Sequence, residues 1–251
     1  MNANNLEIFL QQTNWNAVDE ARQLGESAVP ILKKYSQDAD YQKRQIAVES
    51  AGAVGGDEAA QILIDGLKDE NIGVNLSAAQ ALERNPNPGA TDTVVELFDT
   101  NDEEVFREAL ALAAGGLPGE KTVEALKKIE AADEDQVSVN AQMALAKLGD
   151  ATAKQAIMNQ LDDPLPRTRY DALEKLIYIK DQSLARYARK LLNDKNPAVS
   201  IGLPSDPEFR RVCDQAVDTI VFLLKLAVSF KLSSSVIYKD KEIDEVESLT
   251  R

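Results

Sequence analysis

The sequence predicts an all-α protein, a right-handed α-solenoid of about six helical hairpins with capping helices at its ends. Two observations predict this class. Hydrophobic residues make up 44% of the 251 residues but aromatic ones only 5%, so the core must be built from Ala, Leu, Val and Ile. A small residue also recurs at a nearly constant interval, as in repeat arrays. The recurring positions are Ala47, Ala78, Ala109, Ala141, Ala172 and Ala216, at separations of 31, 31, 32, 31 and 44 residues.

Each repeat contains enough apolar positions for two helices. Four residues before each alanine stand Lys43, Val74, Val105, Val137, Thr168 and Val212. Four residues after it stand Ala51, Leu82, Ala113, Leu145, Leu176 and Ile220. These two columns share one helix face with the alanine, because residues four apart lie above one another. A preceding helix ends on an apolar residue that recurs at Leu67, Phe98, Ile129, Leu161 and Leu192. Each unit is therefore expected to be a helical hairpin.

Acidic residues mark the turn inside each hairpin. They are Asp38 and Asp40, Asp69 and Glu70, Asp102 and Glu103, Asp133 to Asp135, Asp162 and Asp163, and Asp194. A row of carboxylates can bind metal, but each turn of a stacked array presents only one or two of them. Aspartate at a helix start accepts backbone N–H bonds and complements the helix dipole. We therefore interpret these acids as helix caps and expect no metal and no cofactor.

The repeats resemble those of a known family. Segments such as ADEDQVSVNAQMALAKLGD are similar to HEAT repeats of the short bacterial type, also called phycobilisome-lyase HEAT-like repeats, over roughly residues 17–224. The family's arginine after valine is kept at Arg44 and Arg169 and replaced by Asn75, Phe106, Ser138 and Cys213. The resemblance implies a HEAT/armadillo-like superhelix whose second helices line the concave surface.

The ends of the chain depart from the repeat. We expect capping helices over 1–27, the array over 28–224 with an insertion loop near 196–209, and the end of a helix plus a tail over 225–251. A long helix is predicted from Asp206 to Lys231. The insertion is too rich in proline for regular helix, and either packs on the surface or binds a partner. Trp15 is expected to pack against the first hairpin; its alternative role is a binding anchor.

Charge and composition exclude several classes of function. The net charge is −14, and residues 57–150 carry 20 acidic but only 7 basic side chains. This disfavours nucleic-acid binding, which relies on clustered Lys and Arg. The absence of histidine removes His-dependent nucleophile systems and His-ligated metals. The lone Cys213 is best explained as a packed side chain. With no secretory leader or membrane span evident in the sequence, we expect a cytoplasmic protein, not an enzyme and not membrane-bound.

A polar stripe is predicted on the second helices, at positions five before, one before and two after each recurring alanine. Its residues are Gln42, Glu49, Gln80, Glu104, Glu108, Gln136, Asn140, Arg167, Asp171, Glu174, Arg211, Gln215 and Asp218. Because the stripe is mostly acidic and amide, we expect it to bind another protein with a basic surface. The alternative is a solvated face that needs no partner.

The leading hypothesis is a non-catalytic protein-binding scaffold. A sharper form is an inhibitor or immunity-type protein that masks a basic partner, as some bacterial HEAT-like proteins do. The family resemblance implies an alternative, a bilin lyase subunit or chromophore-handling chaperone. Against it, no aromatic or basic cluster in the sequence is evidently committed to tetrapyrrole propionates. HEAT-type deoxyhypusine hydroxylases require histidine ligands, and HEAT-type DNA glycosylases a cationic concave face; the sequence provides neither.

Overall fold

The computed structural model describes residues 3–131, 135–203 and 205–250, which form two compact units. Unit 1 comprises Met1–Leu148 and unit 2 comprises Gly149–Arg251. Asp133 and Glu134 of one predicted acidic turn lie outside the described residues, as does Pro204 of the insertion. This division is not indicated by the repeat spacing, which continues through it.

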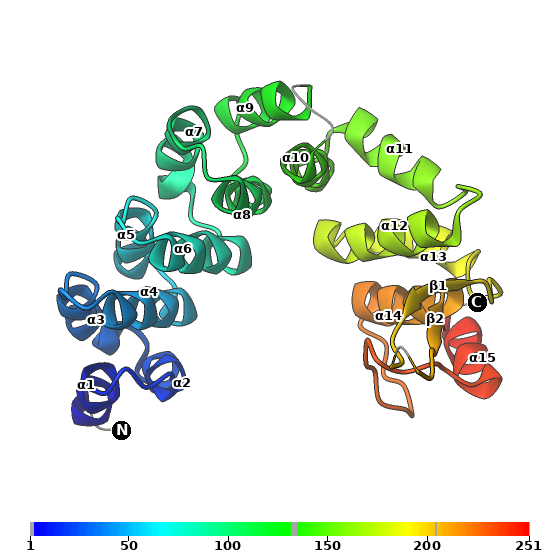
Figure 1. Cartoon of the computed structure of the whole chain (residues 1–251), viewed down its shortest axis with the longest axis horizontal. Helices are drawn as coiled ribbons and strands as arrows, with labels where there is room; N and C mark the ends of the chain where they lie inside the picture. The colour runs from blue at the N-terminus through cyan, green and yellow to red at the C-terminus, as the bar shows by residue number, and fades with distance from the viewer. Residues whose placement is uncertain (1–2, 132–134, 204, 251) are drawn as a thin grey trace. The chain divides into compact units, whose positions relative to one another are not determined.

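Unit 1 is built from consecutive helical hairpins. Their helices are α1 (Ala3–Gln11) with α2 (Asn16–Leu24), α3 (Val29–Tyr35) with α4 (Tyr41–Val54), α5 (Asp57–Gly66) with α6 (Ile72–Arg84), α7 (Thr91–Thr100) with α8 (Glu104–Ala114), and α9 (Glu120–Glu130) with α10 (Gln136–Lys147). Short 3-10 turns, η1 (Gly25–Ala28) and η2 (Pro88–Ala90), precede α3 and α7. Within unit 1 the helices α3, α5, α7 and α9 form an outer row, and α4, α6, α8 and α10 an inner row in which neighbours pack directly on one another (Figure 1).

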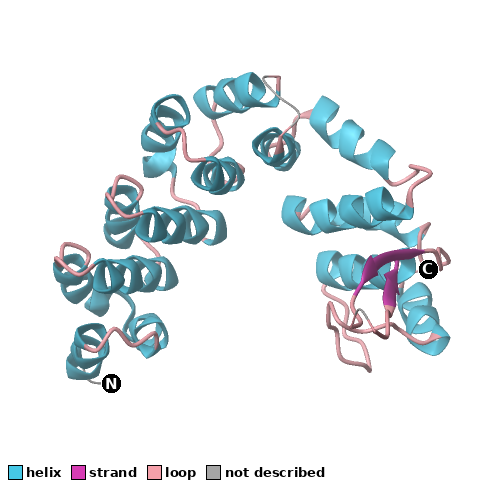
Figure 2. Cartoon of the chain, viewed as in Figure 1, coloured by secondary structure: helices cyan, strands magenta, loops and turns pink. Residues whose placement is uncertain are grey.

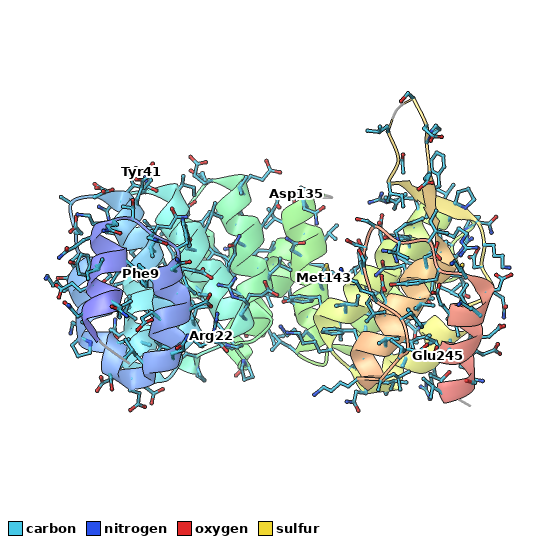
Figure 3. All side chains as sticks on the ribbon, turned by 90° about the horizontal axis from the view of Figure 1, so that it is seen from below. Phe9, Arg22, Tyr41, Asp135, Met143 and Glu245 are labelled. Atoms are coloured by element: carbon cyan, nitrogen blue, oxygen red, sulfur yellow. The ribbon has the colours of Figure 1, made fainter. Side chains whose placement is uncertain are left out.

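The inner-row helices run parallel. Tyr41, which begins α4, and Asp135, directly before α10, lie on the same edge of unit 1 (Figure 3). Arg22, in the last turn of α2, lies on the opposite edge. The N-terminal turns of successive second helices therefore share one edge of the unit.

Unit 2 continues the helical pattern with an inserted β-hairpin. Its elements are α11 (Ala151–Gln160), α12 (Pro166–Ile179), η3 (Gln182–Leu184), α13 (Ala185–Arg189), β1 (Pro197–Ser200), β2 (Phe209–Arg211), α14 (Val212–Leu224) and α15 (Asp240–Leu249). The strands are antiparallel and pair Val199 with Arg210 (Figure 2). The described residues of the connection between them extend away from the helices of the unit (Figure 3). The two short strands lie at or directly after the predicted insertion loop, and the predicted all-α repeat fold is confirmed.

The helix predicted over 206–231 is wrong at both ends. It begins at Val212, because Phe209–Arg211 is extended and pairs with β1. The carboxylate of Asp214 accepts a hydrogen bond from the backbone N–H of Arg211 at 2.8 Å and so caps the new start. The helix ends at Leu224, where Lys225 adopts a left-handed conformation with φ of 52°. The segment from 225 to 239 then folds back, and Tyr238 is buried.

The recurring alanines form the core, with one exception. Ala47, Ala78, Ala141, Ala172 and Ala216 are all completely buried, and the predicted last apolar residues of the first helices are buried as well. Ala109 is only partly buried.

The prediction that Val105 and Ala109 face the core of α8 is wrong. Val105 is 61% exposed, whereas Phe106 and Leu110 are completely buried. The register of this repeat is shifted by one residue, so that Leu110 takes the place of Ala109. Leu110 is then 32 residues after Ala78 and 31 residues before Ala141. Burying Phe and Leu removes more apolar area from water than burying Val and Ala, which explains why the shifted register is preferred.

An arginine ladder joins neighbouring repeats where the family residue is kept. The Nε and Nη2 atoms of Arg44 donate to the carboxylate of Asp69 at 2.8 and 2.9 Å, and Nη1 donates to the Asp38 carbonyl at 2.9 Å. In unit 2, Arg169 forms the same contacts with Asp194 and with the Asp163 carbonyl, each at 2.7 Å. Both arginines are therefore structural.

Other residues occupy the ladder position in the remaining repeats, among them Asn75 and Arg107. Asn75 replaces the arginine and donates Nδ2 to the carbonyls of Gly66, Leu67 and Asp69. The corrected register of α8 places Arg107, rather than Phe106, at this position. The residue 25 positions after Arg107 lies outside the described residues.

The acidic turns cap helices at some positions and serve the ladder at others. Asp40 accepts from the Gln42 N–H at 3.0 Å, and Asp135 accepts from Ser138 at 2.8 Å. In the part of the chain that the structure describes, no three carboxylate, thiol or imidazole groups are grouped so as to hold a metal ion. No described helix is long and apolar enough to cross a membrane.

Candidate functional site

The inner row of unit 1 carries the first part of the predicted polar stripe. Gln42, Gln80, Glu104 and Gln136 are exposed, and Glu49 and Glu108 are partly exposed. Asn140 is buried, with 6% of its surface exposed. Its Nδ2 donates to the Glu108 carbonyl at 3.2 Å, and its Oδ1 accepts from Gln136 at 2.9 Å. Asn140 therefore ties α10 to α8, and little of its side chain is open to a partner.

On α12, two of the three predicted stripe residues, Arg167 and Asp171, pair with each other. Arg167 forms an ion pair with Asp171 at 2.8 Å. Burial, followed by the neighbouring charge of Asp171, raises the pKa of the Glu174 carboxyl. Only Arg167 and Glu174 are exposed in this group.

At α14 the predicted stripe is largely internal. Gln215 is only 4% exposed, and the stripe prediction placed it on an open surface. Asp218 binds the completely buried Arg210 at 2.7 Å, and Arg211 binds Asp214 at 2.8 Å. These residues hold the β-hairpin and the C-terminal segment on α14, because the Tyr238 hydroxyl also donates to Asp218 and the Tyr238 carbonyl accepts from Arg211.

A hollow on the inner row of unit 1 is the best-formed candidate site. We call it the inner groove; it has a volume of about 410 Å³ and lies across α6, α8 and α10. Its lining residues are Leu76, Gln80, Glu83, Arg84, Val105, Glu108, Ala109, Leu112 and Asn140. Leu76, Val105, Ala109 and Leu112 supply apolar walls between polar groups. An apolar hollow with a few polar groups is the usual form of a binding site.

Exposed apolar side chains lead to the groove along one edge of unit 1. Tyr41, Ile72 and Val105 are 46%, 43% and 61% exposed, and each lies in the first turn of a second helix. We call these three residues the edge row. Ile72 is one helical turn before Leu76, so that the edge row and the groove share α6 as well as α8. Trp15, expected to be packed, is also exposed, at 51%.

The charge beside the groove is acidic. Arg84 pairs with Glu49, so their charges offset each other. Glu83 and Glu108 line the groove, and Glu104 is exposed in the first turn of α8. The polar margin therefore favours a cationic ligand.

The sequence prediction missed the apolar part of this site. Val105 was assigned to the core, and Leu76 and Leu112 were not singled out. The signal was present, since α8 has two apolar faces, Val105 with Ala109 and Phe106 with Leu110. With Leu110 as the recurring position, the stripe positions of this repeat become Val105, Ala109 and Leu112, all of which line the groove.

Stacked helical hairpins with a buried small-residue column define an α-helical repeat protein. The sequence signature of HEAT repeats matches residues 11–83, 28–115 and 61–146, which together span just over half of the chain. The chain belongs to the HEAT-repeat family. No curated protein matches it at the level of sequence.

A solved structure shows the same fold. The complex of CpcE and CpcF of phycocyanin lyase from Nostoc sp. PCC7120 contains a chain that matches with a TM-score of 0.61 and 17% identity, over 99% of this chain and 94% of that chain. The archaeal HEAT-like repeats protein from Thermococcus onnurineus NA1 matches with a TM-score of 0.42 and 16% identity, over 90% of this chain and 98% of that one.

Proposed function

We propose that the chain is a non-catalytic protein-binding scaffold that holds its partner on the inner row of unit 1. The inner groove carries this proposal, because Val105 is 61% exposed on a helix whose opposite face is completely buried. Exposed apolar surface on a soluble fold is a mark of an interaction site. Extended helical arrays commonly use such surfaces for binding.

The partner that fits is a protein segment with apolar side chains flanked by Lys or Arg. Its apolar side chains would cover Val105 and Leu112, and its cations would approach Glu83 and Glu108. Acidic margins speed the encounter with a cationic partner and select its orientation. The finer proposal, an inhibitor or immunity-type role toward a basic protein, follows from this charge. We also propose a cytoplasmic location, which the lone cysteine favours.

Capture from native lysate with groove variants tests the proposal. Val105→Ser removes apolar surface, and Glu108→Lys reverses a charge beside it. Both changes affect partly or largely exposed side chains, so the fold is expected to survive. The matched control is Glu124→Lys on α9, an exposed residue of the outer row.

We expect wild type and Glu124→Lys to retain one basic protein at low salt. Glu108→Lys should weaken its binding about tenfold, with a smaller difference at high salt, because the affected attraction is electrostatic. Equal retention by all the variants would exclude the groove as the binding surface.

A second candidate function follows from the likeness to a chain of the CpcE and CpcF complex of phycocyanin lyase. Under it, this chain would be a subunit of a two-chain lyase or a chaperone that handles a bilin. The fold supports this alternative, since the likeness extends over nearly the whole chain. Incubation with a bilin and an absorbance scan test it. A shifted visible band would support the alternative, and an unchanged spectrum would count against it.

A further inference from the structure

A second hollow, in unit 2, has the opposite charge from the inner groove. We call it the basic hollow; it has a volume of about 350 Å³ and is lined by Lys180, Gln182, Phe222, Leu223 and Lys225. A neighbouring hollow of about 310 Å³ shares Gln182 and adds Arg186 and Arg189. In a chain of net charge −14, no carboxylate side chain is among the residues lining either hollow.

The two lysines are brought together by the ends of two packed helices. Lys180 follows α12 and Lys225 follows α14, and these helices pack against each other. Both lysines adopt left-handed backbone conformations, with φ of 61° and 52°. Glycine or asparagine takes this position at lower steric cost. A lysine here complements the helix dipole, but the pairing of two lysines also brings two cations to one hollow.

The nearest acid in the sequence is already engaged. The carboxylate of Asp181 accepts hydrogen bonds from Lys154 Nζ and from the Ser183 N–H, both at 2.9 Å. Among the described residues, neither Lys180 nor Lys225 has a hydrogen-bond or ion-pair partner through its ammonium group. Their charges are therefore not neutralised by a contact within unit 2.

Phe222 and Leu223 supply the apolar part of the wall of the basic hollow. Phe222 is 45% exposed although it belongs to the most apolar helix of the chain, and Leu223 beside it is 97% buried, with 3% exposed. The exposed ring offers a stacking surface, and the Gln182 amide can donate a hydrogen bond. An inorganic anion would leave the ring uncovered, so the site suits a ligand with both an apolar body and a negative charge.

We propose that the basic hollow binds a small organic carboxylate with an aromatic or aliphatic body. The body would lie against Phe222, and the carboxylate would lie between Lys180 and Lys225. A hollow of this volume is in the range of small-molecule sites. The proposal concerns unit 2 alone, so its failure and the failure of the protein-binding role are independent.

Calorimetric titration of the full chain with 2-naphthoate, benzoate and octanoate tests the site. We expect at least one acid to bind with a dissociation constant of about 1 mM or below, as ligands of this size do. The neutral analogue 2-naphthalenemethanol should bind at least about fivefold more weakly than 2-naphthoate, because the lysines attract only the anion. Absence of binding by all three acids, or equal affinity for the neutral analogue, would overturn the proposal.

A charge-removing variant locates the binding. The double variant Lys180→Asn, Lys225→Asn should lower the affinity at least about tenfold, and asparagine tolerates the left-handed backbone at both positions. Its helical circular dichroism should equal that of wild type. The matched control, Lys33→Asn with Lys231→Asn, removes two exposed lysines elsewhere and should leave the affinity unchanged. Unchanged affinity in the double variant would refute the assignment.

A peptide distinguishes the source of the carboxylate. An acetylated peptide ending in Phe carries the same apolar and anionic groups. If it bound more tightly than every small acid, and lost affinity in the double variant, the hollow would be assigned to a protein C-terminus. That result would overturn the small-molecule assignment.

Discussion

Removal of the Arg44 side chain tests whether the arginine ladder holds unit 1 together. Arg44 connects its own acidic turn to Asp69 of the next repeat, and both side chains are about 90% buried, with exposures of 10% and 12%. Arg44→Ala deletes two charge-assisted hydrogen bonds to that carboxylate and the bonds to the Asp38 and Ala39 carbonyls. Asp69 would keep only the hydrogen bond from the Asn71 N–H, at 2.9 Å.

The expected cost is about 3–5 kcal/mol of unfolding free energy, because a buried charge loses its partner. Arg44→Lys should cost less, since lysine keeps the charge but cannot form the paired contact. Burial acts to raise the pKa of Asp69, but the Arg44 and Asn71 hydrogen bonds outweigh it, and the pKa lies below its ordinary value. The stability supplied by the pair is therefore present at neutral pH and lost as the pH falls through the lowered pKa of the folded state.

Urea unfolding followed by fluorescence and by circular dichroism shows which of the two structural units loses stability. Trp15 is the sole tryptophan and lies in unit 1, so its fluorescence reports on that unit, whereas circular dichroism reports on both. Arg44→Ala should shift the fluorescence transition to lower urea. Arg169→Ala, the equivalent change in unit 2, should shift part of the circular dichroism transition and have less effect on fluorescence.

The control is an ion pair on the surface. Lys68 and Glu96 are 48% and 57% exposed, and Lys68→Ala should cost no more than about 1 kcal/mol. If Arg44→Ala and Lys68→Ala had equal costs, the ladder would not stabilise the array, and the burial argument would be refuted.

Three further changes follow from other parts of the structure. Gly52→Ala should lower the unfolding free energy in urea by about 1–3 kcal/mol, because the new Cβ would lie 2.5 Å from the Cβ of Ala81 and push α4 away from α6. An unchanged urea midpoint would show that the two helices separate freely. Cys213, whose thiol pKa is raised to about 11 by burial, should react with Ellman's reagent at pH 8 only after denaturation. The hydrogen bond from Lys154 lowers the pKa of Asp181 to about 2. The stability that the ionised Asp181 carboxylate contributes is therefore lost as the pH falls through that value. Asp181→Asn should lower the Tm at pH 7 but not below pH 2.

The fold could be predicted because it depends on a repeated local pattern. Five of the six recurring alanines occupy completely buried positions, where each lets two helices approach closely. The pairing of strands that are separated in the sequence was harder to predict. Nothing in the sequence NPAVSIGLPSDPEF specified that 197–200 would pair with 209–211, because so short a hairpin depends on the buried contact of Arg210 with Asp218. The sequence pattern placed Asp218 in the polar stripe and gave Arg210 no role.

The candidate site was obscured by a single-residue choice of register. In VFREALALAA, Val105 with Ala109 and Phe106 with Leu110 both have helical spacing, and composition alone does not decide which pair is buried. Phe106 and Leu110 form the buried pair because they remove more apolar area from water, and the smaller pair then lies toward the surface. The exposed Val105 beside Leu112 is therefore a consequence of how α8 packs its core. Val105→Ser should reveal whether partner binding uses this exposed side chain. A variant that folds like wild type but loses its partner would separate the role of α8 in core packing from its role in binding.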